Sequence, residues 1–328
     1  MLKVWMIILL WPAILAAADP ASKGAKMETT PQSAADLLEL ADSSFQQREI
    51  AKSFEQYKLA AEAARAEFNR PIEVEALAQM ARTFLTQGKG DEGKPYLAEA
   101  ASKADDSDAL GWSRFLGVKG RFEWKANDLA TARRTFEEYY NYCALHNLQS
   151  RAIDAANMNG IVAETPEQAI EWTKRGIEIA ESCEAEGQLG PLWNNLGGIH
   201  YDLKQYDQAL ECYLKARDFH WRFSGETAKL FADYHVGMAY RLTGQTEKAK
   251  QWLRPVLSWA ERIGNHSAMA QACDDLGEIE REAGNKAEAL KLLTQAREHF
   301  KADAYPEHSP AIWRSITERV ERLEAELK

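Results

Sequence analysis

A pattern of small and large apolar residues returns about every 40 positions along this chain. The clearest copy reads WNNLGGIHYDLKQYDQALECYLKA and spans residues 193–216. Small residues stand at equivalent places in three successive copies, namely Gly197, Gly237 and Gly277, and Ala209, Ala249 and Ala289. A fixed period of this size predicts stacked supersecondary units rather than one globular core.

Each copy contains two stretches with the apolar spacing of an α-helix. Leu196, Ile199 and Leu203 form the first apolar stripe of one copy, and Leu210 and Tyr213 belong to the second. No run of alternating β-branched residues predicts a strand. We therefore expect an all-α fold of about seven helix–turn–helix repeats. Their predicted starts lie near residues 34, 74, 113, 150, 190, 230 and 270.

The recurring glycines have a predicted packing role. Gly197 and Gly277 should lie where the two helices of a repeat cross, with Ala209 and Ala289 opposite them. A larger side chain there would overpack the crossing at a cost of roughly 1–3 kcal/mol.

These residues resemble the tetratricopeptide repeat family, whose pattern is W-x2-L-G-x2-Y followed by A-x3-F and a further Ala. Trp193, Leu196, Gly197, Ala209 and Tyr213 match it, whereas His200 replaces the usual Tyr. The period of about 40 is similar to the extended repeats of kinesin light chains and of bacterial sensor and regulator proteins. The resemblance implies a right-handed α-solenoid whose concave groove binds peptides or protein segments.

The two ends of the chain differ from the repeats. Lys3 precedes an apolar run that ends in small residues, so residues 1–18 are predicted to be a cleaved signal peptide. An uncleaved N-terminal anchor is the alternative. Residues 19–33 should form a flexible lead-in, 34–309 the repeat array and 310–328 a helix that caps the stack. A cleaved signal peptide predicts a periplasmic or secreted bacterial protein.

Composition and motifs argue against several classes of function. The net charge of −10 disfavours nucleic acid or an anionic membrane as the main partner. No pair of cysteines has metal-ligand spacing, and no catalytic motif is present, so we expect no metal site, no cofactor and no enzymatic activity. The four cysteines are expected to be buried free thiols, and at least one disulfide is the alternative: Cys143, Cys183, Cys212 and Cys273.

The helical register also predicts which side chains line the groove. Positions between the apolar stripes of the first helices should face it: Arg114, Arg121, Lys125, Arg151, Asn194, Asn195, Tyr234, Met238, Arg241, Asp274 and Glu278. The groove would then be basic in the middle and acidic towards the C-terminus. Solvated positions without a partner are the alternative interpretation. Trp124, Trp221 and Trp259 lie near helix ends or off the pattern and are further interface candidates.

The function expected from these features is an exported, non-catalytic scaffold or adaptor that holds a peptide or protein segment. A regulatory or sensor module that changes its superhelical shape on binding is the alternative. The oligomeric state, the partner and the face that binds it stay open.

Overall fold

The computed structural model describes residues 33–328, which form α-helices and one short 3-10 turn, with no strand within that range. The predicted signal peptide and nearly all of the predicted lead-in lie outside the described residues. The chain divides into two compact units, one ending at Leu192 and the other covering Trp193–Lys328. Each unit is described by itself.

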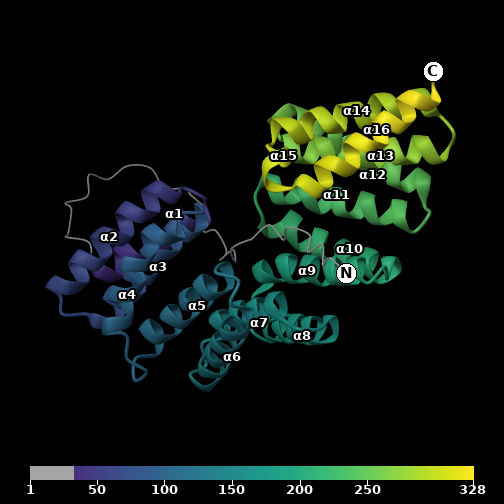
Figure 1. Ribbon diagram of the computed structural model, residues 1–328. Coiled ribbons are helices and arrows are strands. Elements are labelled where there is room, and N and C mark those ends of the chain that lie inside the picture. Colours follow the sequence, from purple (N-terminus) through teal and green to yellow (C-terminus); the bar gives the residue numbers. More distant parts are fainter. Residues whose placement is uncertain (1–32) are drawn as a thin grey trace, which may run out of the picture. The chain divides into compact units, whose positions relative to one another are not determined.

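Unit 1 contains four helix pairs within its described part. Their bounds are α1 (Ala34–Gln46) and α2 (Ile50–Ala66), α3 (Arg70–Thr86) and α4 (Gly90–Lys103), α5 (Ala109–Lys125) and α6 (Leu129–Leu145), and α7 (Gln149–Val162) and α8 (Pro166–Ser182). The first helices α1, α3, α5 and α7 contact one another in succession, and each of α2, α4 and α6 contacts the first helix of the next pair (Figure 1). The first helices of unit 1 therefore form a continuous layer, called here the first-helix face.

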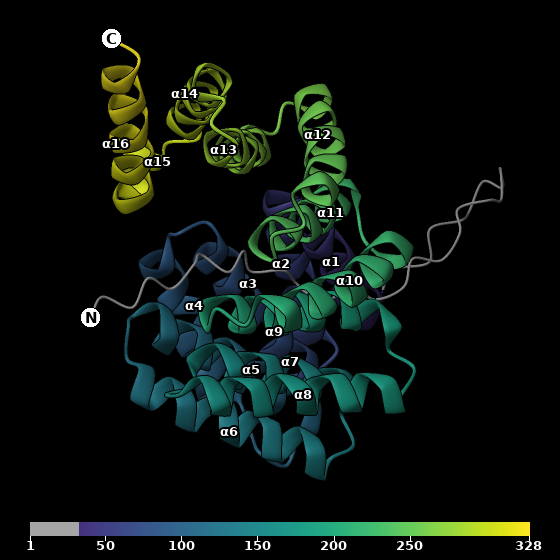
Figure 2. The same cartoon turned by 90° about the vertical axis from the view of Figure 1, so that its right-hand side faces the viewer.

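Unit 2 continues the same pattern. The division falls within α9 (Leu189–Asp202), which is followed by α10 (Tyr206–Phe223), α11 (Glu226–Leu242), α12 (Thr246–Ile263), α13 (His266–Glu282), α14 (Lys286–Ala302), α15 (Tyr305–His308) and α16 (Pro310–Glu326). Helix α16 packs on α14 and α15 (Figure 2). It buries Ile316, Val320 and Leu323 and leaves its charged side exposed, as a terminal cap requires. The described chain thus has seven helix pairs and a capping helix, which confirms the predicted all-α solenoid.

The repeating glycines lie at helix crossings, as predicted. A Cβ atom on Gly197 would lie 2.6 Å from the ring of Tyr213. A Cβ on Gly237 would lie 2.9 Å from Leu253, and one on Gly277 would lie 2.8 Å from Leu293. In each pair the large residue follows its glycine by 16 positions. Close approach of the two helices therefore explains the spacing that the sequence shows.

Left-handed backbone ends many of the helices. Gly244 and Gly284 have φ angles of 74° and 81° and follow α11 and α13. The next amide, that of Gln245 or Asn285, donates to the carbonyl of Tyr240 or Glu280, five residues earlier. This is the hydrogen bond of a Schellman C-cap, and glycine adopts the required conformation without a steric penalty.

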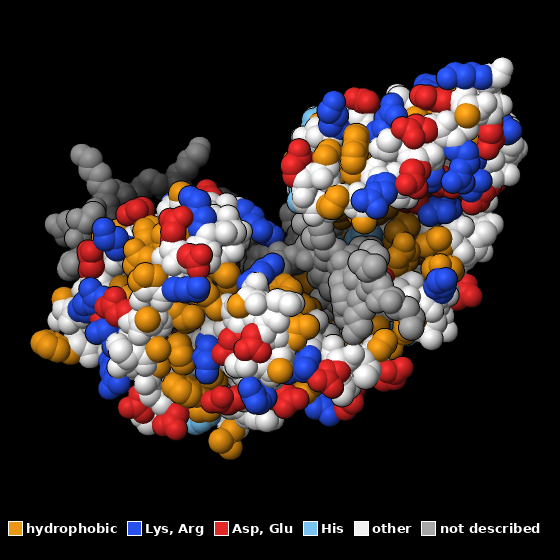
Figure 3. Space-filling view, in the orientation of Figure 1, with side chains coloured by type: hydrophobic (Ala, Val, Ile, Leu, Met, Phe, Trp, Pro, Cys, Tyr) orange, Lys and Arg blue, Asp and Glu red, His pale blue; other side chains and the backbone are white. Residues whose placement is uncertain are grey.

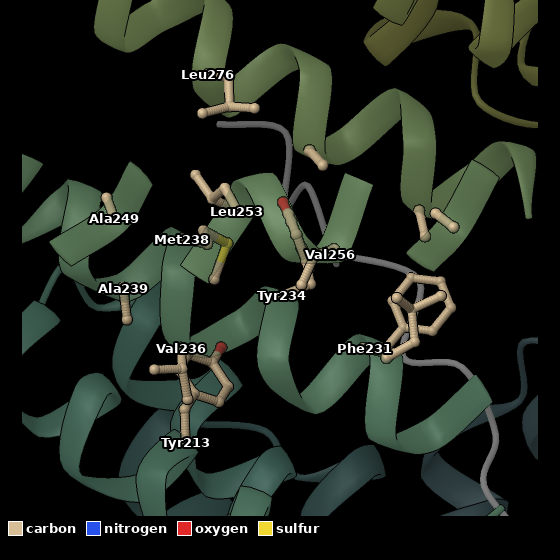
Figure 4. Close-up of a cluster of buried hydrophobic side chains, with 14 of the residues drawn as sticks. Tyr213, Phe231, Tyr234, Val236, Met238, Ala239, Ala249, Leu253, Val256 and Leu276 are labelled. Atoms are coloured by element: carbon tan, nitrogen blue, oxygen red, sulfur yellow. The ribbon is translucent and has the colours of Figure 1, made fainter. Parts of the chain in front are cut away.

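The core is a series of apolar clusters between neighbouring helices. In unit 2, Tyr213, Val236, Met238 and Leu253 pack together with residues of α13 (Figure 4). On the molecular face drawn in Figure 3, Lys and Arg side chains are interspersed with Asp and Glu over each unit.

Candidate functional site

Charged side chains of the first helices meet on the first-helix face of unit 1. They come from α1, α3, α5 and α7 and are called here the arginine–carboxylate network: Asp42, Glu75, Arg82, Arg114, Arg121, Arg151 and Asp154. Glu75 and Arg82, and likewise Arg114 and Arg121, stand seven residues apart, which places both members of a pair on one side of their helix.

Arg114 joins three helices in this network. Its Nη2 lies 3.1 Å from Oδ2 of Asp42, and its Nε lies 3.2 Å from Oε2 of Glu75. Arg151 of α7 also pairs with Glu75 and donates to Ser113. Glu75 is buried, so its charge needs these two guanidinium partners. The pairs fix α1, α3, α5 and α7 relative to one another.

Hydrogen bonds hold Asp42 in place. Tyr57 donates to Oδ1 of Asp42 at 2.6 Å, and Nε2 of Gln79 donates to the same oxygen at 2.9 Å. Burial raises the pKa of Asp42, but the Arg114 guanidinium and these two donors outweigh burial, so the pKa lies below its ordinary value. Asp42 is therefore ionised at neutral pH.

Arg121 forms a second centre with Asp154. Its Nη2 lies 2.6 Å from Oδ1 of Asp154, and its Nη1 donates to the carbonyl of Gly117 at 2.8 Å. Tyr139 donates to the other oxygen of Asp154 at 3.3 Å. Burial raises the pKa of Asp154, but the charges of Arg121 and Arg82 and the hydrogen bond from Arg121 together outweigh burial, so the pKa lies below its ordinary value. The buried Arg121 is thus held in a defined orientation.

The structure brings together three of the four groove residues predicted in unit 1. Arg114, Arg121 and Arg151 belong to the network, whereas Lys125 is exposed in the last turn of α5 and lies 4.4 Å from the centre of the Trp124 ring. The prediction of a basic middle counted only Arg and Lys side chains. Asp42, Glu75 and Asp154 supply matching carboxylates, so this face carries charges of both signs.

Sequence reasoning missed four members of the network, namely Asp42, Glu75, Arg82 and Asp154. Helical spacing would have placed Glu75 and Arg82 together and Asp154 beside Arg151. The contacts themselves join residues of different repeats, such as Asp42 and Arg114. Spacing within one helix does not encode these contacts.

In unit 2 the predicted groove residues divide into core and ion-paired positions. Tyr234 and Met238 are 6% and 5% exposed and lie in the apolar cluster of Figure 4, which differs from the predicted groove position. Helices α10, α12 and α13 all contact α11, so the residues between its apolar stripes are buried as well. Arg241 pairs with Asp275 at 2.6 Å, and burial raises the pKa of Asp275 despite this partner.

The acidic end of the predicted groove is covered by the last helix. Arg319 of α16 lies 2.5 Å from Asp274 and 3.0 Å from Glu278. Asp274 and Glu278 therefore stabilise the attachment of the capping helix.

The predicted groove residues Asn194 and Asn195 are partly exposed on α9.

Two of the three tryptophans predicted as interface candidates form a second surface feature, whereas Trp124 lies in unit 1 against Lys125. Trp221 and Trp259 have ring centres 5.9 Å apart, and their indole N–H groups donate to Asp233 and Glu226 at 2.8 Å. Arg217 lies 5.0 Å from the centre of the Trp221 ring. Trp221 is 41% exposed, so this cluster presents aromatic surface on unit 2.

Metal ligation, membrane spanning and thiol reactivity were each assessed for the described part of the chain. No group of three or more His, Cys, Asp or Glu is placed to hold a metal ion among residues 33–328. Within that same range no helix combines the length and apolarity needed to span a membrane. Cys143, Cys183 and Cys273 have free thiols, and burial raises the pKa of Cys143 and of Cys273 to about 12. Thiols of such high pKa are poor nucleophiles.

Comparison with known families identifies the repeat. Residues 191–219 and 226–302 match family models that are each described as Tetratricopeptide repeat. The chain carries tetratricopeptide repeats. The matches cover the region where the 40-residue pattern is clearest, and the resemblance inferred from Trp193, Gly197 and Tyr213 is confirmed. No curated protein matches the sequence.

Several solved structures are similar to this chain in fold. One is a Signal Transduction ATPase with Numerous Domains protein with a tetratricopeptide repeat sensor from Pyrococcus horikoshii, with a TM-score of 0.67, 15% identity and coverage of 88% of this chain and 44% of that chain. The apo form of RapI gives a TM-score of 0.66 at 14% identity, over 82% of this chain and 77% of that chain. Aspartyl phosphate phosphatase F from Bacillus subtilis gives 0.57 at 15% identity, over 81% and 70%. This chain spans less than half of the first of these proteins, and identities this low establish the fold alone.

Proposed function

We propose that this tetratricopeptide repeat protein is an exported scaffold that binds an extended peptide or protein segment on the first-helix face of unit 1. The arginine–carboxylate network carries the proposal. It aligns polar groups of four successive first helices and fixes them by ion pairs between helices. Preorganised side chains lose little conformational entropy when a partner binds.

Binding rather than catalysis fits the chemistry of this face. Arg114, Arg121 and Arg151 are already hydrogen-bonded, and the nearby thiol of Cys143 has a raised pKa. Guanidinium and carboxylate groups of this kind recognise polar side chains and backbone amides. The proposal includes a periplasmic or secreted location. This location rests on the signal peptide predicted at residues 1–18, which lie outside the described residues.

Site-specific photo-crosslinking tests the binding face. A photoreactive residue at Lys125, which is exposed at the end of α5, should capture the partner from an extract of the source cells. The matched control is the same residue at Leu59, which is 51% exposed on α2 of the same unit. Overlapping peptides of the captured protein should then compete with it for binding. Capture from Leu59 but not from Lys125, or failure of every peptide to compete, would contradict the proposal.

A regulatory function is the second candidate. It is favoured by the division of the chain at Leu192 into two units, whose arrangement a bound peptide could change. Similar structures include a protein described as having a tetratricopeptide repeat sensor. Small-angle scattering with and without the captured peptide distinguishes the two functions, because a scaffold keeps its scattering profile and a regulator changes it.

A further inference from the structure

Arg82 stands apart from the other arginines of the network. Arg114, Arg121 and Arg151 each pair with at least one carboxylate. Among the described residues, Arg82 has neither a salt bridge nor a side-chain hydrogen bond, and its guanidinium carbon lies 5.0 Å from the centre of the Phe45 ring. Four arginines meet three carboxylates in this network, so one positive charge is left without a partner.

The surroundings of Arg82 make this charge costly. The guanidinium is only partly exposed, and both Arg121 and Arg114 repel it. Burial, followed by the charge of Arg121, lowers the pKa of Arg82 to about 10. Two carboxylates attract it, and both already have other partners. Asp154 is hydrogen-bonded to Arg121 and Tyr139. Asp42 is hydrogen-bonded to Arg114, Tyr57 and Gln79. An anion brought by a partner would relieve this imbalance.

A second donor in the network also lacks an acceptor. Nε of Arg121 is buried and has no hydrogen-bond partner within the described residues. A buried N–H without an acceptor costs about 1–3 kcal/mol. The unsatisfied Nε of Arg121 therefore adds to the uncompensated positive charge around Arg82, whose own N–H groups are unused and whose guanidinium lies against the Phe45 ring.

We infer that Arg82 is the binding site for a single carboxylate of the bound segment, that is, for an Asp or Glu side chain of an acidic peptide. The inference rests on the proposed function, since it names the chemistry of the segment held on the first-helix face. A carboxylate brings one negative charge, which matches the one surplus positive charge. A phosphate group would bring roughly 1.5 to 2 negative charges and overcompensate the site.

Selection of random ten-residue peptides for binding to the full chain tests both the proposed peptide binding and the carboxylate site at Arg82. Peptides should be enriched, and one position should be restricted to Asp or Glu. Failure to enrich any peptide would refute the proposed function and this inference together. Enrichment without an acidic position would refute the carboxylate site and leave peptide binding intact.

Affinity measurements then assign the acidic position to Arg82. With the unchanged protein, replacing the selected Glu of the peptide by Gln should weaken binding about 10- to 100-fold, as expected for a charge-assisted hydrogen bond. In Arg82→Gln the same replacement should change affinity less than about twofold, because the coupled group is gone. Arg82→Lys should retain part of the preference, since it keeps the charge and loses the bidentate geometry.

Two comparisons complete the experiment. Arg134 is an exposed arginine of α6, which is not one of the helices that form the first-helix face. Arg134→Gln is therefore the matched control and should bind like the unchanged protein. Full sensitivity to the Glu-to-Gln replacement in Arg82→Gln, with an unchanged circular dichroism spectrum, would overturn the assignment. Tighter binding of a phosphoserine peptide than of the Glu peptide would also overturn it, in favour of a phosphate site.

Discussion

Gly197 and Gly198 are neighbours on α9 with opposite predicted responses to the same substitution. A Cβ atom on Gly197 would lie 2.6 Å from Cε1 and 2.7 Å from Cδ1 of Tyr213, whereas a Cβ on Gly198 meets nothing within 4 Å. Tyr213 is 1% exposed, and its ring also stacks on His235 with ring centres 5.1 Å apart. The ring therefore lies between two elements and has little room to move.

The structure gives the size of the effect. Restoring ordinary contact at 3.4 Å requires the Tyr213 ring to move by about 0.8 Å. Overpacking of this kind costs roughly 1–3 kcal/mol. Both substitutions gain about 1 kcal/mol because alanine favours helix over glycine. Gly198→Ala should thus stabilise by about 1 kcal/mol, and Gly197→Ala should be less stable than Gly198→Ala by roughly 1–3 kcal/mol.

Urea and thermal unfolding followed by circular dichroism measure this difference. At about 2–4 °C per kcal/mol, the melting temperature of Gly197→Ala should lie several degrees below that of Gly198→Ala. Comparing the two variants cancels the gain in helix propensity that both share. The remaining difference in stability is the cost of overpacking at the helix crossing. Equal midpoints for the two variants would refute the argument that Gly197 is required by close helix packing.

Three further predictions concern other parts of the chain. Asp154 has a folded pKa below its ordinary value of 3.8, so its stabilising effect is complete above that pH and is lost as the pH falls through the folded pKa. Asp154→Asn should lower the free energy of unfolding by about 3 kcal/mol at pH 7 and should flatten the decline of that free energy as the pH falls below 3.8. Urea unfolding at a series of pH values measures this decline, and the same decline in the variant and the unchanged protein would contradict this role. Cys143 and Cys273 should resist iodoacetamide at pH 8 until urea unfolds the chain, whereas the partly exposed Cys183 should react in the native state, and mass spectrometry of the labelled protein separates these outcomes. The N-terminal sequence of the protein recovered from its source cells should begin near Asp19, and recovery with Met1 would favour the uncleaved anchor.

The sequence predicted much of the fold because the repeat is written in local spacings. The interval of 16 residues between Gly197 and Tyr213 places both at one crossing, and it recurs at Gly237 and Leu253. Helix starts were placed within a few residues, as for α1 at Ala34 and α7 at Gln149.

The candidate site was less accessible from the sequence. Register alone selected Arg114, Arg121 and Arg151 as groove residues, and the structure brings them together in one network. Register gave no reason to choose Asp42 or Glu75 as their partners. Register also placed Tyr234 and Met238 on the groove, although neighbouring helices bury them.

The chain by itself therefore determined the helix pairs and their stacking, since close helix crossings demand small residues at fixed intervals. Only the tertiary structure decided which charges are neutralised. Arg114 meets Asp42 across two repeats, and Arg82 meets no carboxylate among the described residues. The physical reason is that ion pairing depends on distances between helices, which a one-dimensional pattern does not contain.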